Sequence, residues 1–251
     1  MTYTAGQGGG DPRPSHREQV GELKRDIVAA GKILFRHRIL DSFGHVSARH
    51  PADATLFLLP RRMAPTLVQA DDVREFTLEG ESAAPDDAPT FVERFIHSEI
   101  YKARPDVNAI VHSHAPGAVA ASAVPDLAFR PIAHTCGFLR EGAARFEIRD
   151  FAGDESDLLI RNSSLGEALA RTLGLGTTIL MRGHGSTVVG SSIPEAVYRA
   201  IYLEANASML VMALTMGVPV FLTTQEAEAA ELTGPLQTER SWQAWKRDLD
   251  E

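Results

Sequence analysis

The sequence has almost no cysteine and no long uninterrupted run of apolar residues. Cys136 is the only cysteine among 251 residues, so no disulfide can form within the chain, and a reducing cytoplasm is the compartment we expect. The most apolar stretch, 207–222, is broken by Gly217 and Pro219 and falls short of the roughly 20 residues that span a bilayer. We therefore predict no membrane segment.

Positive charge is also scarce. The chain has 25 Lys and Arg residues against 33 Asp and Glu residues, a formal net charge of -8 at pH 7. This chain has no excess of positive charge that would attract nucleic acid or an anionic membrane surface, and we expect neither partner. A local cation or arginine can still override the mean field, so small carboxylates and phosphates stay open as substrates.

The apolar content permits one sizeable core, since 44% of the residues are hydrophobic. Residues 1–16 lack the basic start and apolar stretch of a secretory signal and are predicted to be a flexible tail. Residues 17–220 are predicted to form one domain, followed by a C-terminal helical extension over 221–251.

Hydrophobic periodicity predicts an alternation of helices and strands. Helices are expected over 17–37, 90–102, 118–123, 164–173 and from a capping box at 192 to about 216. Strands are expected around 46, 58 and 111, and over 145–148, 177–181 and 186–189. Because there is no strict βαβ repeat, the prediction is an α/β or α+β fold with helices flanking a mixed sheet.

His112 and His114 are separated by one residue in the stretch that we predict to be a strand. Side chains alternate between the two faces of a strand, so both imidazoles would project to the same side. That spacing suits two ligands of one metal ion. An exposed polar strand end is the alternative interpretation.

A third histidine, His184, lies between Gly183 and Gly185 in a predicted turn between two strands. The two glycines allow a tight backbone path that could aim the imidazole into a cleft. Three neutral imidazoles can hold Zn²⁺ or a similar ion and leave positions open for substrate. Alternatively, His184 is simply a hydrogen-bonded turn residue.

Glu93 lies near the start of the helix that leads into the histidine strand, and His97 follows one turn later on the same helical face. The Glu93 carboxylate could bind a metal ion or transfer protons. It could equally serve only to complement the helix dipole.

Three segments, in this order, resemble the class II aldolase/adducin family, with a likeness that extends from about residue 17 to 216. They are FGHVSAR at 43–49, the span 93–122 and RGHGSTVVG at 182–190. The resemblance implies a three-layer fold, in which helices flank a central and mostly antiparallel sheet, and a homotetramer.

The same resemblance implies that Glu93, His112, His114 and His184 surround a divalent metal ion, zinc or manganese and possibly iron. Adducin-type members lack the metal-site histidines. This chain keeps them, so an enzyme is favoured over a non-enzymatic adducin-like interaction module.

The chain departs from the sugar-phosphate members of the family at two places. It has His45 after Gly44, where those members carry asparagine, and Phe91 and Val92 in place of a serine pair before Glu93. These changes remove hydrogen-bond donors that a buried phosphate would need. A phosphosugar substrate is therefore less favoured.

The stretches 44–51, 60–65, 131–138 and 147–154 resemble the branch of hydroxy-aromatic and pyridine dicarboxylate decarboxylases. Arg61 is expected to hold a substrate carboxylate through its planar fork, unless it is a solvated surface charge, and Ser47 is expected to be a second substrate contact. Candidate proton donors are Glu93, His45 and His134, among which the sequence does not choose.

The predicted function is a divalent-metal-dependent carbon–carbon lyase that decarboxylates a hydroxylated aromatic or heteroaromatic (di)carboxylate. Decarboxylation and retro-aldol cleavage both leave carbanion charge that a Lewis-acidic cation can absorb. A class II aldolase or epimerase acting on a sugar phosphate or hydroxy-aldehyde is therefore the alternative.

Overall fold

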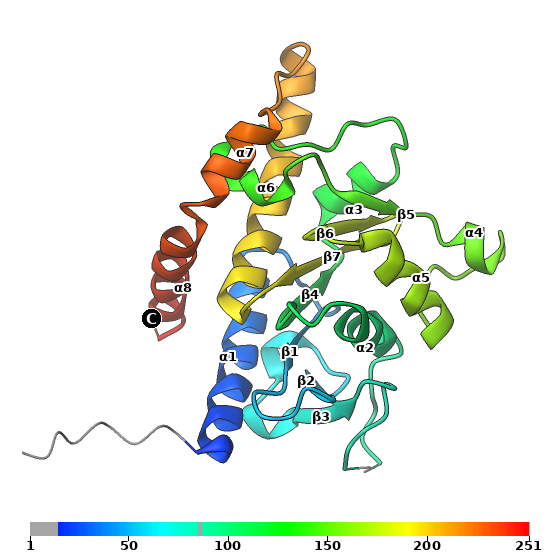
Figure 1. Ribbon diagram of the computed structural model, residues 1–251, viewed down its shortest axis with the longest axis vertical. Coiled ribbons are helices and arrows are strands. Elements are labelled where there is room, and N and C mark those ends of the chain that lie inside the picture. The colour runs from blue at the N-terminus through cyan, green and yellow to red at the C-terminus, as the bar shows by residue number, and fades with distance from the viewer. Residues whose placement is uncertain (1–14, 85–86, 251) are drawn as a thin grey trace, which may run out of the picture.

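A seven-stranded sheet forms the centre of the molecule in the computed structural model, which describes residues 15–84 and 87–250 (Figure 1). The strand order is β3-β2-β1-β4-β7-β6-β5, and every described pairing is antiparallel except β5 with β6. The strands are β1 His45–Arg49, β2 Leu56–Pro60, β3 Val73–Thr77, β4 Ala109–Ser113, β5 Ala144–Phe146, β6 Thr178–Met181 and β7 Gly185–Gly190. The predicted mixed, mostly antiparallel sheet is confirmed.

Helices cover both faces of this sheet. They are α1 His16–Arg36, α2 Arg94–Ala103, α3 Pro116–Ser122, α4 Arg149–Ala152, α5 Ser163–Leu173, α6 Ile193–Met216, α7 Thr224–Glu231 and α8 Gly234–Asp250, with short 3-10 turns η1 Pro65–Leu67, η2 Ala70–Asp72 and η3 His134–Leu139. One apolar cluster joins α1, α6 and Trp242 of α8 to the sheet, and a second joins α2 and α5 to the opposite face (Figure 1). This is the three-layer arrangement that the family resemblance implies.

Strand alternation decides which side chains face α2. Along β1, Val46 and Ala48 enter the apolar cluster under α1 and α6, so His45 and Ser47 point to the other face. Along β4, Val111 belongs to the α1 and α6 side, and His112 again faces α2. The polar residues of the central strands therefore collect in one layer.

Several predicted elements differ from the structure at their ends. Helix α2 begins at Arg94 rather than near residue 90, with Glu93 as its N-cap residue. Strand β4 ends at Ser113, so His114 lies just beyond it, because Pro116 opens α3 and requires an extended residue before it. Strand β3 was not predicted; it gains its order from pairing with β2 at the sheet edge.

The C-terminal helices predicted for residues 221–251 are present as α7 and α8. Trp242 of α8 is buried against the main core, and the domain boundary at residue 220 stays a prediction. Of the predicted tail, residues 1–14 lie outside the described part of the chain. Within that described part, none of the helices has the length and apolar character needed to cross a membrane.

Candidate metal centre

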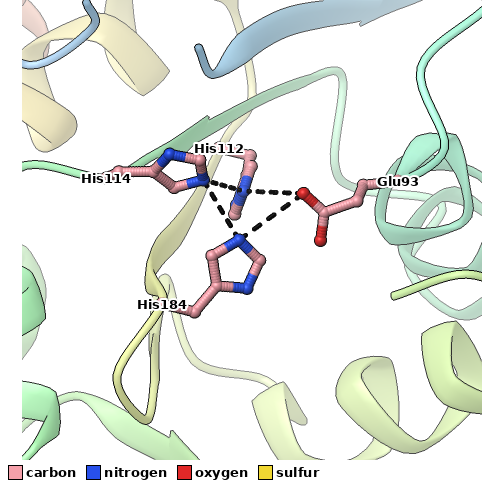
Figure 2. Close-up of side chains that lie close together, drawn as sticks. All are labelled: Glu93, His112, His114 and His184. Atoms are coloured by element: carbon pink, nitrogen blue, oxygen red, sulfur yellow. Dashed lines mark hydrogen bonds and ion pairs between the residues drawn. The ribbon is translucent and has the colours of Figure 1, made fainter. Parts of the chain in front are cut away.

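Four side chains from three segments, namely the end of β4, the β6–β7 turn and the start of α2, converge on one point (Figure 2). His114 Nε2 lies 3.1 Å from His112 Nε2 and 3.0 Å from His184 Nε2. Glu93 Oε2 lies 3.5 Å from the Nε2 atoms of both His112 and His184. One ligand atom from each residue falls within 4.8 Å of all the others, so the predicted quartet is brought together.

The backbone explains why the third histidine reaches the other two. Gly183 has a backbone φ of +66°, which residues with a Cβ rarely adopt. It turns the chain between β6 and β7. A Cβ at Gly185 would collide with the carbonyl oxygen of Ser113, so only glycine lets β7 start this close to the end of β4. Together the two glycines hold His184 opposite His112 and His114.

Neighbouring groups orient two of the four side chains. His112 Nδ1 is 3.2 Å from Thr187 Oγ1, which in turn donates to Met181 Sδ, so Thr187 accepts the Nδ1–H of His112. This places the proton of His112 on Nδ1 and leaves its Nε2 lone pair facing the cluster. Glu93 Oε1 accepts the backbone N–H of Ile160 at 3.0 Å, which leaves Oε2 facing the imidazoles.

The donor set fits a divalent cation by chemistry and by spacing. Two ligand atoms that each lie about 2.1 Å from one tetrahedral ion stand about 3.4 Å apart. Four of the six separations are 3.0 to 3.5 Å, close to that value, and all six are within 4.8 Å. Hydrogen bonds alone cannot satisfy the group, because the single Nε2 of His114 faces two other imidazole nitrogens. Imidazole and carboxylate ligands together suit zinc, manganese or iron.

Burial and mutual contacts keep this group in the form that binds cations. Burial lowers the pKa of His112, and burial together with the neighbouring imidazoles of His112 and His184 lowers the pKa of His114 to about 4. Burial acts to raise the pKa of Glu93, but its close contacts with His112 and His184 outweigh burial and hold that pKa far below its usual range. At neutral pH His112 and His114 are therefore neutral and the Glu93 carboxylate is charged.

A cavity of about 510 Å³ opens beside this group and reaches His114. Its other walls come from the end of α1, the following turn and the start of α3. The lining residues are Phe35, Arg36, Arg38, Ile39, Leu40, Asp41 and Pro116.

His45 is the predicted proton donor that lies next to the metal centre. Its ring centroid is 5.1 Å from that of His112 and 4.5 Å from that of Phe91. His45 Nδ1 also lies 2.6 Å from Nε2 of His97, a buried residue on α2. Burial, with the nearby imidazoles of His97 and His112, holds the pKa of His45 well below its ordinary value.

Three other predicted residues do not join this group. Ser47 is fully buried and hydrogen-bonded to His97 and Tyr101, and its direct contact with substrate stays a prediction. Arg61 lies 3.4 Å from Asp72, with its side chain 37% exposed. His134 is exposed on η3, at a different cavity that Tyr198 of α6 also lines. Within one chain, neither Arg61 nor His134 converges on the metal centre.

Sequence reasoning missed the supporting groups Thr187, Tyr101 and Ile160. His97 and Tyr101 are four residues apart on a helix, and this spacing already places them on one face. Nothing in the sequence says that this face meets β1. The Ile160 contact is made by a backbone N–H and carries no side-chain signal.

Comparison with known proteins agrees with this geometry. The family model for the Class II Aldolase and Adducin N-terminal domain matches residues 25–211, and the chain belongs to this family. It is 35% identical to Decarboxylase tropJ of Talaromyces stipitatus over 90% of this chain and 93% of that protein. It is 28% identical to 3,4-dihydroxyphthalate decarboxylase of Arthrobacter keyseri over 86% and 89% of the two chains.

Solved structures support the fold. The structure of L-fuculose 1-phosphate aldolase from Glaciozyma antarctica PI12 superposes with a TM-score of 0.77, covering 95% of this chain and 94% of that one. Its sequence identity is 22%, so this likeness speaks for the fold alone.

Proposed function

We propose that this protein is a divalent-metal-dependent carboxy-lyase that removes CO₂ from a hydroxylated aromatic or heteroaromatic carboxylate. The observation that carries the proposal is the convergence of three imidazoles and one carboxylate beside an open cavity. The similarity to Decarboxylase tropJ over nearly the full length of both chains supports decarboxylation over other lyase reactions.

His112, His114 and His184 are the proposed metal ligands, and Glu93 is the proposed fourth ligand or proton carrier. When bound, the cation would supply a Lewis acid that stabilises the negative charge left as a carbon–carbon bond breaks. The chain keeps His112 oriented through Thr187 and keeps Glu93 oriented through Ile160. Zinc, manganese and iron are all compatible with this nitrogen and oxygen donor set.

The proposed reaction breaks the bond between a ring carbon and its carboxylate. The electron pair stays on the ring carbon, CO₂ leaves, and one proton adds to the same carbon. Burial of the ligand group, with Glu93 8% exposed and His112 inaccessible, limits the water that competes for the developing charge.

A second substrate carboxylate requires a cation. Arg36 and Arg38 both line the cavity that reaches His114, and Arg36 already donates to the backbone carbonyl of Asp248. Arg38 is exposed and lines the cavity that reaches His114, whereas Arg61 is paired with Asp72. Arg38 is therefore proposed as the first anchor to test, with Arg61 as its matched comparison. Hydrogen bonds to charged groups contribute enough that losing the true anchor should raise KM roughly 10- to 100-fold.

The deciding experiment supplies a metal-free preparation with Mn²⁺ or Zn²⁺ and offers it a dihydroxyphthalate-type acid. CO₂ release that needs the added metal is expected, and Glu93→Gln, which keeps the Ile160 contact but loses the charge, should lower kcat strongly. Aldehyde formation from L-fuculose 1-phosphate without any CO₂ release would overturn the proposal in favour of an aldolase. In the same assay, Arg38→Ala and Arg61→Ala are compared for their effect on KM.

The proposal extends to the assembly of the protein and to its compartment. The homotetramer rests on the family resemblance, and light scattering should give the mass of four chains; the mass of one chain would contradict it. The buried thiol of Cys136 suits a reducing cytoplasm.

A further inference from the structure

A row of four buried polar side chains leads away from the metal centre between β1 and α2. His45 Nδ1 lies 2.6 Å from His97 Nε2, and His97 Nδ1 lies 2.6 Å from Ser47 Oγ. Ser47 Oγ lies 2.8 Å from the hydroxyl of Tyr101. All four residues are at most 4% exposed. We call them the tyrosine–histidine chain.

The far end of this chain decides where its protons sit. Among the described residues, the hydroxyl of Tyr101 has one hydrogen-bond partner, Ser47 Oγ. If Ser47 donated to Tyr101, the phenolic O–H would be left buried with no acceptor, which costs about 1–3 kcal/mol. Tyr101 therefore donates to Ser47.

The remaining protons follow from the first one. Ser47 Oγ accepts the hydrogen bond from the Tyr101 hydroxyl, and the Ser47 hydroxyl donates its own hydrogen bond to His97 Nδ1. A neutral His97 then carries its hydrogen on Nε2 and donates it to His45 Nδ1. His45, accepting on Nδ1, keeps its own hydrogen on Nε2. Every member except the last donates one hydrogen bond toward the metal centre.

Both histidines are neutral at physiological pH. Burial, with the nearby imidazole of His112, lowers the pKa of His97 to about 3. Burial raises the pKa of Tyr101 well above its ordinary value, so the phenol keeps its proton. The chain is thus a set of neutral groups with one defined direction.

We propose that Tyr101, Ser47 and His97 are positioning residues that hold His45 as its Nε2–H tautomer, so that His45 donates a hydrogen bond to a negatively charged oxygen of the substrate beside His112. This role rests on the proposed function, since it requires a substrate that carries a carboxylate or phenolate oxygen. The hydrogen-bonded tautomer itself does not depend on which substrate binds.

The same direction argues against His45 as the source of the proton that ends up on the ring carbon. A neutral imidazole that gave up its Nε2 proton would have to draw another through His97 and Ser47 from Tyr101. That transfer would leave a buried phenolate, which the low polarity around Tyr101 disfavours. His45 is therefore a hydrogen-bond donor to the substrate and not the source of the proton.

The tautomer can be observed directly by two-bond ¹H–¹⁵N NMR correlation of histidine-labelled, zinc-loaded protein. His45, assigned by the loss of its signals in His45→Asn, should show a protonated Nε2 and an unprotonated Nδ1. Tyr101→Phe and Ser47→Ala should move this pattern toward a mixture of tautomers. Tyr198→Phe is the matched control, because that hydroxyl bonds to Thr135 and Gln237 elsewhere.

Kinetics on the metal-loaded enzyme separate positioning from simple stability. Ser47→Ala should lower kcat about tenfold, the size expected when one buried hydrogen bond is lost, with KM nearly unchanged. Ser98→Ala is the control. Ser98 lies on α2, the helix that carries His97 and Tyr101, and its Oγ is buried with no hydrogen-bond partner in the described structure. Its kcat and tautomer pattern should match those of the unaltered protein.

Two results would overturn the inference. One is a His45 with its hydrogen on Nδ1 in the unaltered protein. The other is a tautomer pattern that stays the same in both Tyr101→Phe and Ser47→Ala. If no acid is decarboxylated but the Nε2–H pattern is found and shifts in the two variants, the proposed function fails while the positioning by the chain stands. Tyr101→Phe removes only one oxygen atom, so it supplies the answer even where Ser47→Ala fails to fold.

Discussion

Two groups of buried polar residues lie next to each other on the α2 face of the sheet and use histidine in opposite ways. In the metal-ligand group of Glu93, His112, His114 and His184, the ring nitrogens converge on one point and cannot all be satisfied by one another. In the tyrosine–histidine chain each donor meets one acceptor in a line.

The difference lies in the second nitrogen of each ring. Thr187 takes the Nδ1–H of His112, which frees its Nε2 lone pair for a cation. His97 instead has partners at both nitrogens, so no lone pair is left over. Whether a buried histidine becomes a ligand or a link in a hydrogen-bonded row is therefore decided by its neighbours.

The largest effect expected from breaking this contrast is the loss of metal from the ligand group. His184→Ala removes one of the four donors and should weaken metal binding by more than about 100-fold, because supporting residues alone change affinity by about 10- to 100-fold. Metal content after dialysis against a chelator measures this. His134→Ala, on the exposed η3 turn, should retain the metal. Full metal content in both His184→Ala and His112→Ala would refute the assigned centre.

A smaller effect is expected when only the support of a ligand is removed. Thr187→Val keeps the side-chain shape and deletes the oxygen that accepts from His112 Nδ1. Metal affinity, measured by competition with a chromophoric chelator, should fall about 10- to 100-fold. An affinity equal to that of the unaltered protein would show that Thr187 does not orient His112.

The smallest effect expected, taken per pH unit, is the part of the pH dependence of stability that comes from His97. The pKa of His97 is about 3 in the folded protein against an ordinary 6.5, so the unfolded state binds the extra proton between these values. The stabilising contribution of His97 is then complete above about pH 6.5 and falls by roughly 1.4 kcal/mol per pH unit as the pH drops toward 3.

Urea unfolding of metal-free protein at several pH values measures this slope. His97→Gln should have a shallower slope between pH 6.5 and pH 4 than the unaltered protein. Parallel curves for the two proteins would mean that His97 is not held neutral by burial.

The sequence allowed the ligand group to be predicted because its signals are local. The two-residue spacing of His112 and His114 and the glycines around His184 are visible in a few neighbouring positions. His114 reaches its place although β4 ends one residue earlier, since the chain stays extended up to Pro116. Arg61 and Ser47 were chosen by resemblance, which says nothing about whether Asp72 or Tyr101 already holds them.

The sequence by itself determined most helices, most strands, the family and the four residues of the proposed metal centre. These depend on periodicity, turn residues and motif spacing, which act over a few positions. Only the tertiary structure decided that α2 lies over β1, so that His97 and Tyr101 meet His45 and Ser47 some fifty positions away. Hydrogen bonds between distant segments depend on how helices pack on the sheet, and that packing minimises the free energy of the whole chain rather than of any local stretch.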